Sequence, residues 1–332
     1  MKKILSVTLA LIMLFALVSC GGKTDGKTDG KANDDHVVDV KVLGGPTGMG
    51  IAKLWNDSKE GKSALKYNFS VAASPDAAYL TDIKNGNFDI AALPTNVAAK
   101  LYNTGAPLQI AAVNTLGVLY VLQTGETDIT SVSDLKGRTI YTTGEGATPE
   151  YALRYILTKN GVDPDNDVDI IYETEGTTVV ADIKKGDASV VMVPEPLATN
   201  LSVGGMASVV LDVTEEWNKV AEKDTLMQGC VVVSNNFVKD HKAQLDKFLE
   251  EYKASTEYVN ANNAEAGQMI FDLEIITVSA AVSEKAIPTS KITYIDGGSM
   301  KTALNTLYGI LLDADAASVG GKAPDDGIYY TK

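Results

Sequence analysis

Two stretches rich in glycine and threonine carry the residues best suited to hold a small ligand. Residues 44–50 read GGPTGMG and residues 142–150 read TTGEGATPE. Each follows an apolar segment typical of a strand and precedes a helical pattern. Glycine lets the backbone approach a ligand closely, and threonine hydroxyls add hydrogen bonds. Both stretches would place free backbone N–H groups at the carboxyl edge of a sheet, where open α/β sheets bind ligands. The alternative is two tight turns with helix caps.

Two further loops are expected at the same edge. Residues 93–96 read LPTN, with Thr95 opening a helix, and residues 193–196 read VPEP, with Glu195 between two prolines. A carboxylate held there would either pair with a cationic group of a ligand or only favour the start of the next helix. The sequence leaves both interpretations open.

The residues needed for catalysis are scarce. The chain has two histidines, His36 and His241, and the pattern places neither in a cleft. Cys230 stands alone in an apolar run, which is typical of a small buried side chain. The glycine stretches lack the Lys-Ser or Lys-Thr of a phosphate loop and the spacing of a dinucleotide fingerprint. We therefore predict no catalytic residue, no metal site and no cofactor, and do not expect an enzyme.

The first residues predict export. Two lysines precede an apolar run over residues 4–18, as in a secretory signal, and LVSCG at 17–21 resembles the bacterial lipobox. In lipoproteins the cysteine, here Cys20, is lipidated and becomes the N-terminus; the alternative is an ordinary signal peptide with a chance cysteine. Residues 1–20 are thus predicted to be a lipoprotein signal peptide. Residues 21–36 carry a repeated KTDG and no large apolar side chain before the last position, which predicts a flexible tether.

The remaining chain has an ordinary globular composition. It is 45% hydrophobic in a total of 332 residues, which is long enough for two domains. The formal net charge of −14 argues against nucleic acid as a partner, because that binding depends on lysine and arginine neutralising phosphates.

Strand and helix patterns alternate along most of the sequence, which predicts an α/β fold with mainly parallel sheets. The last third reads as helices with few strands and is expected to pack back on the first domain. Strands are predicted at 38–43, 68–73, 89–93, 109–113, 119–123, 139–142, 168–172, 188–193, 208–213 and 227–234, and helices at 51–56, 76–84, 96–102, 149–160, 178–185, 244–262, 264–273 and 298–312.

These motifs, in this order, carry a resemblance to a known family. GPTGMGIAKLW, GNFDIAALPTNVAAKLYN, SVSDLKGRTIYTTGEGATPEYALRYIL and GDASVVMVPEPLAT follow a lipobox and a tether. The chain resembles the NMT1/THI5-like solute-binding lipoproteins of ABC importers, a branch that includes sulfonate-, nitrate- and thiamine-precursor-binding proteins. The resemblance extends from residue 38 to about residue 249.

The resemblance implies a type II periplasmic-binding-protein fold, in which two α/β lobes are joined by two crossovers and close around a solute. Lobe one would comprise residues 37–122 plus 229–332, and lobe two residues 123–228. The crossovers would fall near 122–123 and 228–230. The implied partners are a small solute and the subunits of an ABC permease. The implied location is the outer face of the cytoplasmic membrane, with the protein monomeric and anchored by lipid.

The family pocket, carried over position by position, implies a set of ligand-binding residues. Tyr151 and Trp217 are further aromatic candidates. The implied set is Thr47, Gly48, Met49, Thr95, Asn96, Asn114, Leu116, Tyr120, Gly144, Gly146, Ala147, Thr148 and Glu195.

The arginine content bears on the solute. The chain has two arginines, Arg138 and Arg154, so a guanidinium clamp for a sulfonate is not obvious. A sulfonate could still bind to helix N-termini, but the composition favours a neutral or weakly cationic ring such as a pyrimidine precursor. One alternative is a pyrimidine-synthase-like enzyme of the same fold, whose histidine and cysteine-rich motif this chain lacks. Another is a surface ligand sensor without transport.

Overall fold

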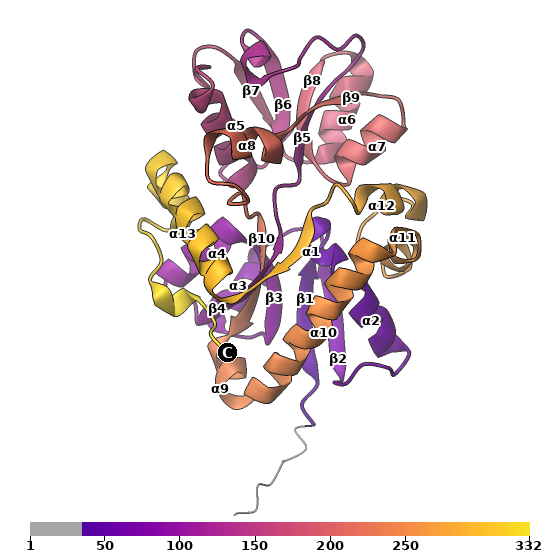
Figure 1. Ribbon diagram of the computed structural model, residues 1–332, viewed down its shortest axis with the longest axis vertical. Coiled ribbons are helices and arrows are strands. Elements are labelled where there is room, and N and C mark those ends of the chain that lie inside the picture. The colour runs from indigo at the N-terminus through magenta and orange to yellow at the C-terminus, as the bar shows by residue number, and fades with distance from the viewer. Residues whose placement is uncertain (1–34) are drawn as a thin grey trace, which may run out of the picture. The chain divides into compact units, whose positions relative to one another are not determined.

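The computed structural model describes residues 35–332, which form one compact unit made of two α/β lobes (Figure 1). The predicted signal peptide, the lipidation site Cys20 and the tether up to residue 34 lie outside the described residues. Asp35 and His36, assigned to the tether from the sequence, belong to the compact unit instead. The physical reason is an anchoring contact, because His36 Nε2 lies 2.7 Å from Asp89 Oδ2.

The first lobe is built on a six-stranded sheet. Its strands are β1 (Val38–Leu43), β2 (Tyr67–Ala72), β3 (Ile90–Pro94), β4 (Leu108–Thr115), β10 (Gly229–Ser234) and β11 (Ile292–Ile295). They lie in the order β11-β4-β10-β3-β1-β2. β1 runs parallel to β2 and β3, whereas β10 is antiparallel to β3 and β4, and β11 is antiparallel to β4.

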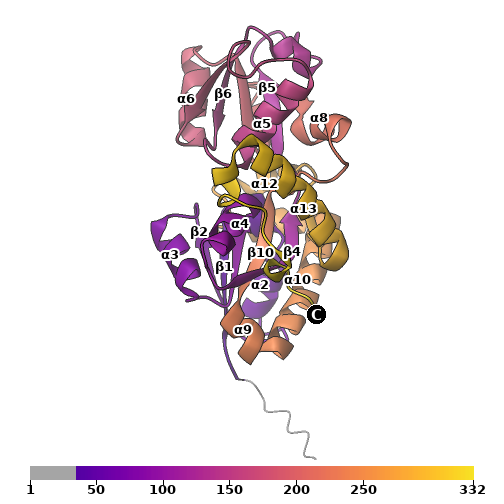
Figure 2. The same cartoon turned by 90° about the vertical axis from the view of Figure 1, so that its left-hand side faces the viewer.

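Helices cover both faces of this sheet. They are α1 (Pro46–Met49), α2 (Ala52–Lys59), α3 (Ala77–Asn85), α4 (Thr95–Asn103), α9 (Asn235–Asp240), α10 (Lys242–Ala261), α11 (Asn263–Asp272), α12 (Ala280–Ala286) and α13 (Gly297–Ala314), with short 3-10 turns η2 (Ala316–Val319) and η3 (Asp326–Ile328). One face packs against α2, α10 and α11, and the other against α3, α4 and α13 (Figure 2). Alternation in β1 explains this, since Val38, Val40 and Val42 all point toward the α10 side.

The second lobe is built on a five-stranded sheet. Its strands are β5 (Leu119–Gln123), β6 (Thr139–Thr143), β7 (Asp169–Glu173), β8 (Val190–Pro194) and β9 (Ser208–Asp212), in the order β7-β6-β8-β5-β9. Its helices are η1 (Val132–Leu135), α5 (Thr148–Lys159), α6 (Gly176–Lys185), α7 (Leu197–Val203) and α8 (Val213–Val220). One face packs against α5 and α8 and the other against α6 and α7.

Antiparallel strands make both sheets mixed, which corrects the expectation of mainly parallel sheets. β5 and β10 each follow a crossover between the lobes, and each runs antiparallel to both neighbours. A strand that comes directly from the crossover enters its sheet at the carboxyl edge of the parallel strands, so it must run in the opposite direction. The sequence pattern shows only that these segments are apolar and extended, not where they enter.

The first crossover also lies earlier than the sequence suggested. The chain leaves the first sheet after Thr115 and enters the second at Leu119, so β5 belongs to the second sheet, whereas the sequence placed this boundary at 122–123. The return to the first lobe spans residues 221–228. One apolar cluster runs through both passages and includes Val113, Leu119 and Met227. The crossovers are therefore part of the core.

Candidate ligand-binding site

The loops that follow β3 and β6 bring residues of the two lobes into direct contact. Thr148 Oγ1, at the start of α5, donates a hydrogen bond of 3.1 Å to Asn96 Oδ1, in the first turn of α4. Both side chains are almost fully buried. The two lobes therefore meet at two residues of the predicted set.

The glycine junction of the first lobe, residues 44–50, is closely packed. A Cβ atom on Gly48 would lie 2.2 Å from the carbonyl oxygen of Leu43, so a larger residue fits only if the backbone shifts. The side chain of Met49 is fully buried in the apolar cluster under α10. Thr47 is half-buried, and its carbonyl oxygen accepts a hydrogen bond of 3.0 Å from Asn114 Nδ2. Of these three predicted residues, only Thr47 has an accessible side chain.

Thr95 connects α4 to the second crossover. It is fully buried, and its hydroxyl donates to the Met227 carbonyl oxygen at 2.6 Å. Its amide donates to the Gln228 carbonyl at 3.1 Å, and its own carbonyl accepts from the Tyr308 hydroxyl. All its polar groups are thus used within the protein, and Thr95 positions the loop rather than offering a ligand contact.

The residues around the first crossover have a similar positioning role. Asn114 is buried and supports Thr47, as described above, and Leu116 is half-buried against the apolar cluster. Tyr120, on β5 of the second lobe, donates its hydroxyl to the Thr289 carbonyl oxygen at 2.7 Å, in the segment that follows α12. Tyr120 is therefore a second point at which the lobes touch.

The glycine junction of the second lobe, residues 142–150, is open. Gly144 and Gly146 have φ angles of +87° and +69°, a region that favours glycine. Gly146 is exposed, and its amide donates to Glu150 Oε2 at 2.6 Å. Ala147 is half-buried at the N-cap of α5. This loop leaves backbone accessible at Gly146 in its middle, whereas the first junction is closely packed at Gly48.

Glu195 closes the first turn of α7. Its carboxylate accepts hydrogen bonds from the Thr199 amide at 3.0 Å and the Thr199 hydroxyl at 2.9 Å. Burial raises its pKa, although hydrogen bonds from Thr289 and Thr199 oppose the rise. The geometry favours helix capping over pairing with a ligand cation, and the bond from Thr289 adds a third contact between lobes.

Several residues at the lobe junction carry no signal in the sequence. The Thr289 carbonyl oxygen accepts a hydrogen bond from the Tyr120 hydroxyl, and Lys291 Nζ lies 3.6 Å from Asp212 Oδ2 of β9. Asp315, after α13, accepts a hydrogen bond of 2.8 Å from Tyr151. Thr289, Lys291 and Asp315 come from the helical last third, which has no glycine loop to mark them.

Trp217, the other aromatic candidate, lies in the core. It is 1% exposed, and its Nε1 donates to the Thr225 hydroxyl at 2.9 Å. Its ring packs on Tyr155. Trp217 therefore supports α8 and is removed from the candidate contacts.

Two hollows flank the lobe contacts. One, of about 600 Å³, is lined by Gly44, Gly45 and residues 273–278 of the first lobe, and by Pro196 of the second. The other, of about 1170 Å³, lies between α5 and the end of α13 and includes Gly146, Tyr151 and Asp315. Small-molecule sites commonly occupy about 300–1,000 Å³, so the first hollow has a suitable size.

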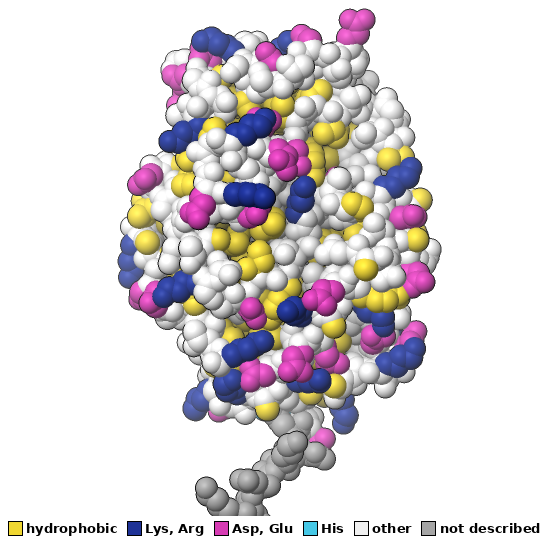
Figure 3. All heavy atoms as spheres, in the orientation of Figure 1, with side chains coloured by type: hydrophobic (Ala, Val, Ile, Leu, Met, Phe, Trp, Pro, Cys, Tyr) yellow, Lys and Arg dark blue, Asp and Glu magenta, His cyan; other side chains and the backbone are white. Residues whose placement is uncertain are grey.

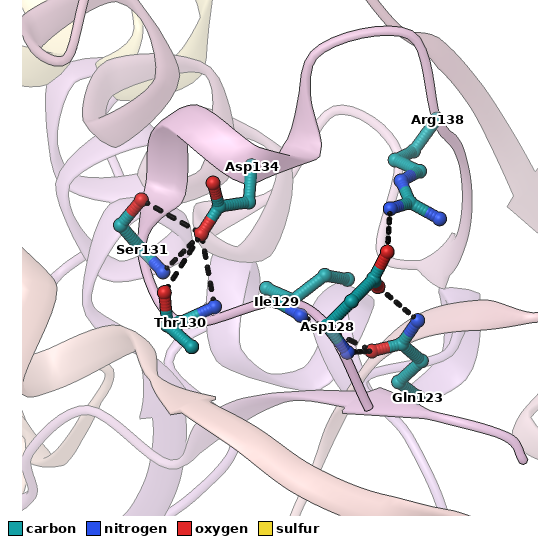
Figure 4. Close-up of polar contacts among 7 residues, drawn as sticks. All are labelled: Gln123, Asp128, Ile129, Thr130, Ser131, Asp134 and Arg138. Carbon is teal, nitrogen blue, oxygen red and sulfur yellow. Dashed lines mark hydrogen bonds and ion pairs between the residues drawn. The ribbon is translucent and has the colours of Figure 1, made fainter. Parts of the chain in front are cut away.

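Both arginines are paired with aspartates. Arg138 Nη2 donates to Asp128 Oδ2 at 2.6 Å, and Gln123 Nε2 donates to the same carboxylate (Figure 4). Hydrogen bonds from Gln123 and Arg138 lower the pKa of Asp128. This group precedes β6 and so lies at the edge opposite the glycine junction. Arg154 Nη2 donates to Asp165 Oδ1 at 2.6 Å. Neither guanidinium is available as a clamp at the junction loops.

The remaining reactive side chains of residues 35–332 are engaged elsewhere in the fold. Figure 3 shows acidic and basic side chains interspersed over the face in view. The rings of His36 and His241 stack, with centroids 4.1 Å apart, and His36 contacts Asp89 at the edge opposite the junction loops. Cys230 is fully buried in β10, which raises its pKa. Within residues 35–332, no three metal-ligating side chains form a group that could hold an ion.

None of the helices in the part of the chain that the structure describes has the length and apolar character needed to cross a bilayer.

A model of the periplasmic substrate-binding protein of phosphonate ABC transporters matches residues 62–281. No curated protein sequence matches the chain.

Solved structures share the fold at low identity. An ABC transporter protein from Parabacteroides distasonis is 23% identical, with a TM-score of 0.73, over 89% of this chain and 99% of that one. The aliphatic sulphonate-binding protein SsuA of Escherichia coli is 14% identical, with a TM-score of 0.70, over 86% and 96% of the two chains. The nitrate-binding protein NrtA of Synechocystis PCC 6803 is 14% identical, with a TM-score of 0.60, over 85% and 84%.

Proposed function

The chain belongs to the family of phosphonate-type periplasmic substrate-binding proteins of ABC transporters, and on this premise we propose a lipid-anchored receptor that closes around a small ring compound. The receptor delivers its solute to the permease subunits of an importer. The observation that carries the proposal is the contact between Thr148 and Asn96, because it joins the two lobes at loops suited to hold a ligand.

The accessible members of the predicted set are the proposed ligand contacts. They are Thr47, Leu116, Gly144, Gly146 and Ala147, which are half-buried or exposed at the loop ends. The buried members Asn96, Tyr120 and Thr148 hold the lobes together, while Gly48, Met49, Thr95, Asn114 and Glu195 shape the loops.

The proposed solute is a neutral or weakly cationic ring of the thiamine-precursor type. Anions are less suited, because both arginines are already paired with aspartates. A sulfonate remains the second candidate, since helix N-termini alone hold such groups in some proteins and a solved structure of the same fold is named a sulphonate-binding protein.

Anchoring by Cys20 is part of the proposal. The lipobox-like LVSCG and the KTDG-rich tether support a protein held at the outer face of the cytoplasmic membrane as a monomer. A Cys20→Ser variant is expected to be released in soluble form with unchanged ligand affinity. Retention of the variant in the membrane fraction would contradict lipidation at this residue.

Two alternatives share the fold. A pyrimidine-synthase-like enzyme would need a histidine at the site, whereas His36 and His241 stack at the opposite edge of the first sheet. A surface sensor without transport would share all the binding features, and only a permease partner distinguishes it. Reconstitution with a candidate permease, measuring uptake into vesicles, separates the receptor from the sensor.

Native mass spectrometry of the protein lacking residues 1–20 tests the ligand class first. A co-purified small mass with the composition of a ring compound is the expected result. A co-purified sulfonate or phosphonate would overturn the ring proposal and keep the receptor. If the protein is ligand-free, thermal shifts with pyrimidines and sulfonates decide, and no stabilisation by any pyrimidine would overturn the ring proposal.

A further inference from the structure

The smaller hollow contains a pair of aromatic rings suited to contact another ring. Trp55 and Phe69 stack with centroids 5.1 Å apart and planes inclined by 22°. Both side chains are half-buried, and both line the hollow. Aromatic faces attract flat ligands and, through the ring quadrupole, cations.

Two glycines, Gly44 and Gly45, also line the hollow. Gly45 has a φ of +100°, and a Cβ atom there would meet nothing within 4 Å. Gly44 donates its amide to the Ala72 carbonyl at 2.8 Å, which fixes the loop beside β2. Gly45 thus leaves open space in the hollow that the stacked rings also line, whereas a Cβ atom on Gly44 would lie 3.3 Å from the Ile275 carbonyl oxygen.

One carboxylate is the only charge around the hollow. Among the described residues that line it, Glu274 is the single charged side chain, and it is exposed. Lysine and arginine are absent from this lining. A cation is therefore favoured there over an anion.

The backbone conformation of Glu274 is unfavourable for any residue other than glycine. Glu274 ends α11 with a φ of +55°. The Ile275 amide donates to the Ile270 carbonyl at 3.1 Å, and the Glu274 amide to the Phe271 carbonyl at 3.0 Å. This is the helix-ending motif that normally carries glycine at the left-handed position. Glutamate is less stable there, so the position is not optimised for folding.

The second lobe reaches the hollow through one residue. Pro196 lines it and stands at the N-cap of α7. The preceding Glu195 is bonded to Thr289 of the first lobe. A ligand in the hollow would therefore touch both lobes and favour their closure.

We propose that this hollow, which none of the accessible residues of the predicted set lines, is the subsite for the ring of the solute, and that Glu274 is a specificity-determining residue that selects a positively charged ring. The occupant is a small aromatic cation, stacked against Trp55 and Phe69, with its charge facing the Glu274 carboxylate. This inference rests on the proposed function and deepens it.

Three probes of similar shape and different charge test the subsite: benzylamine, benzyl alcohol and benzenesulfonate. Protein lacking residues 1–20 is titrated with each at millimolar concentrations while tryptophan fluorescence and calorimetry are recorded. We expect affinity to fall in the order cation, neutral, anion. The fluorescence change should come from Trp55, since Trp217 is 1% exposed, and it should disappear in Trp55→Phe.

Glu274→Gly separates the carboxylate from the fold. The variant should lower benzylamine affinity by about three- to tenfold and leave benzyl alcohol unchanged. It should also raise the Tm of the free protein by about 2 °C, because glycine suits the positive φ. Asp224→Gly is the matched control: Asp224 has a φ of +60°, is exposed, and lies in the second crossover away from the hollow. The Tm of the Asp224→Gly control should rise, and its affinity for benzylamine should not change.

The outcomes are distinguishable. If benzylamine binds equally to wild type and Glu274→Gly, or if Trp55 fluorescence does not respond to a bound probe, the subsite is wrong and the receptor function stands. If none of the probes binds the wild type, the subsite is overturned, while the co-purified mass independently decides the receptor function.

Discussion

The two glycine junctions look alike in the sequence and differ in the folded protein. At residues 44–50 the short helix α1 begins within the core, and Gly48 packs directly on the Leu43 carbonyl. At residues 142–150 the loop is open, Gly146 is exposed, and the twelve-residue helix α5 follows. Gly48 of the first junction is needed for close packing, whereas Gly146 of the second is needed for its backbone conformation.

This difference teaches that a Gly/Thr-rich loop is not by itself a binding loop. In the first junction, Gly48 and Met49 serve packing, and the residues that face open space are Gly44 and Gly45 at its start. In the second, the accessible backbone lies in the middle of the motif, and the last threonine, Thr148, joins the lobes. Substitutions at matched positions of the two junctions should therefore have unequal effects.

The largest effect is expected for Gly48→Ala. The new Cβ would lie 2.2 Å from a backbone oxygen, which is overpacking that no side-chain movement relieves, and should cost about 3 kcal/mol of stability. Urea unfolding measures the loss. Gly298→Ala in α13, where a Cβ meets nothing within 4 Å, is the control and should not destabilise. A Gly48→Ala protein as stable as wild type would show that the first junction is as open as the second.

Thr148→Val should have the next largest effect. The substitution removes the hydroxyl and leaves the buried Asn96 Oδ1 without its donor, at a cost of about 1–2 kcal/mol. Urea unfolding and small-angle scattering together measure the stability and the spread of the lobes. Thr158→Val, exposed on the same helix, is the control. If Thr148→Val and Thr158→Val change stability and lobe separation equally, the second junction does not hold the lobes together.

Gly146→Ala should cost less than either. The space around Gly146 is open, so only the left-handed backbone is penalised, by about 1 kcal/mol. Gly125→Ala, with a φ of +72° and open surroundings, should lose a similar amount. Thermal unfolding of the two variants compares them. A loss as large as that of Gly48→Ala would mean that the second junction is packed like the first.

The smallest effect on stability is expected for Glu195→Gln, in the loop after β8, which is a third strand-to-helix junction. Burial raises the pKa of Glu195 above its unfolded value of about 4.3. The folded protein therefore binds this proton more tightly than the unfolded chain, and the group lowers stability as pH rises through that window. In Glu195→Gln this loss is absent, so the Tm of the variant should gain on that of the wild type as pH rises from the unfolded pKa toward neutrality.

Thermal scans across that range measure the Glu195 effect. Glu175→Gln, at the exposed N-cap of α6, serves as the control. Parallel Tm curves for Glu195→Gln and wild type would show that the third junction is as open to water as the second.

The alternation of strands and helices determined the fold class. Apolar strands such as Asp169–Glu173 and Val190–Pro194, separated by amphipathic helices, lie within a few residues of their predicted positions, because local periodicity reflects burial of one face. The sequence could not place β5, whose apolar run suits either sheet. Sheet membership depends on pairing with β8 and β9, strands that follow some 70 to 90 residues later.

The sequence predicted which loops form the candidate site, but not which of their side chains are accessible. Strand ends rich in glycine and threonine lie at the carboxyl edge of each sheet, because parallel strands bring their carboxyl ends together. Tertiary packing decided which side chains remain accessible. The Thr95 hydroxyl donates a hydrogen bond to the Met227 carbonyl oxygen, and the Tyr120 hydroxyl donates one to the Thr289 carbonyl oxygen. Those partners lie more than 130 residues away along the chain. Local sequence carries no record of such long-range contacts, so only the folded chain separates the residues that hold the lobes from those that can meet a ligand.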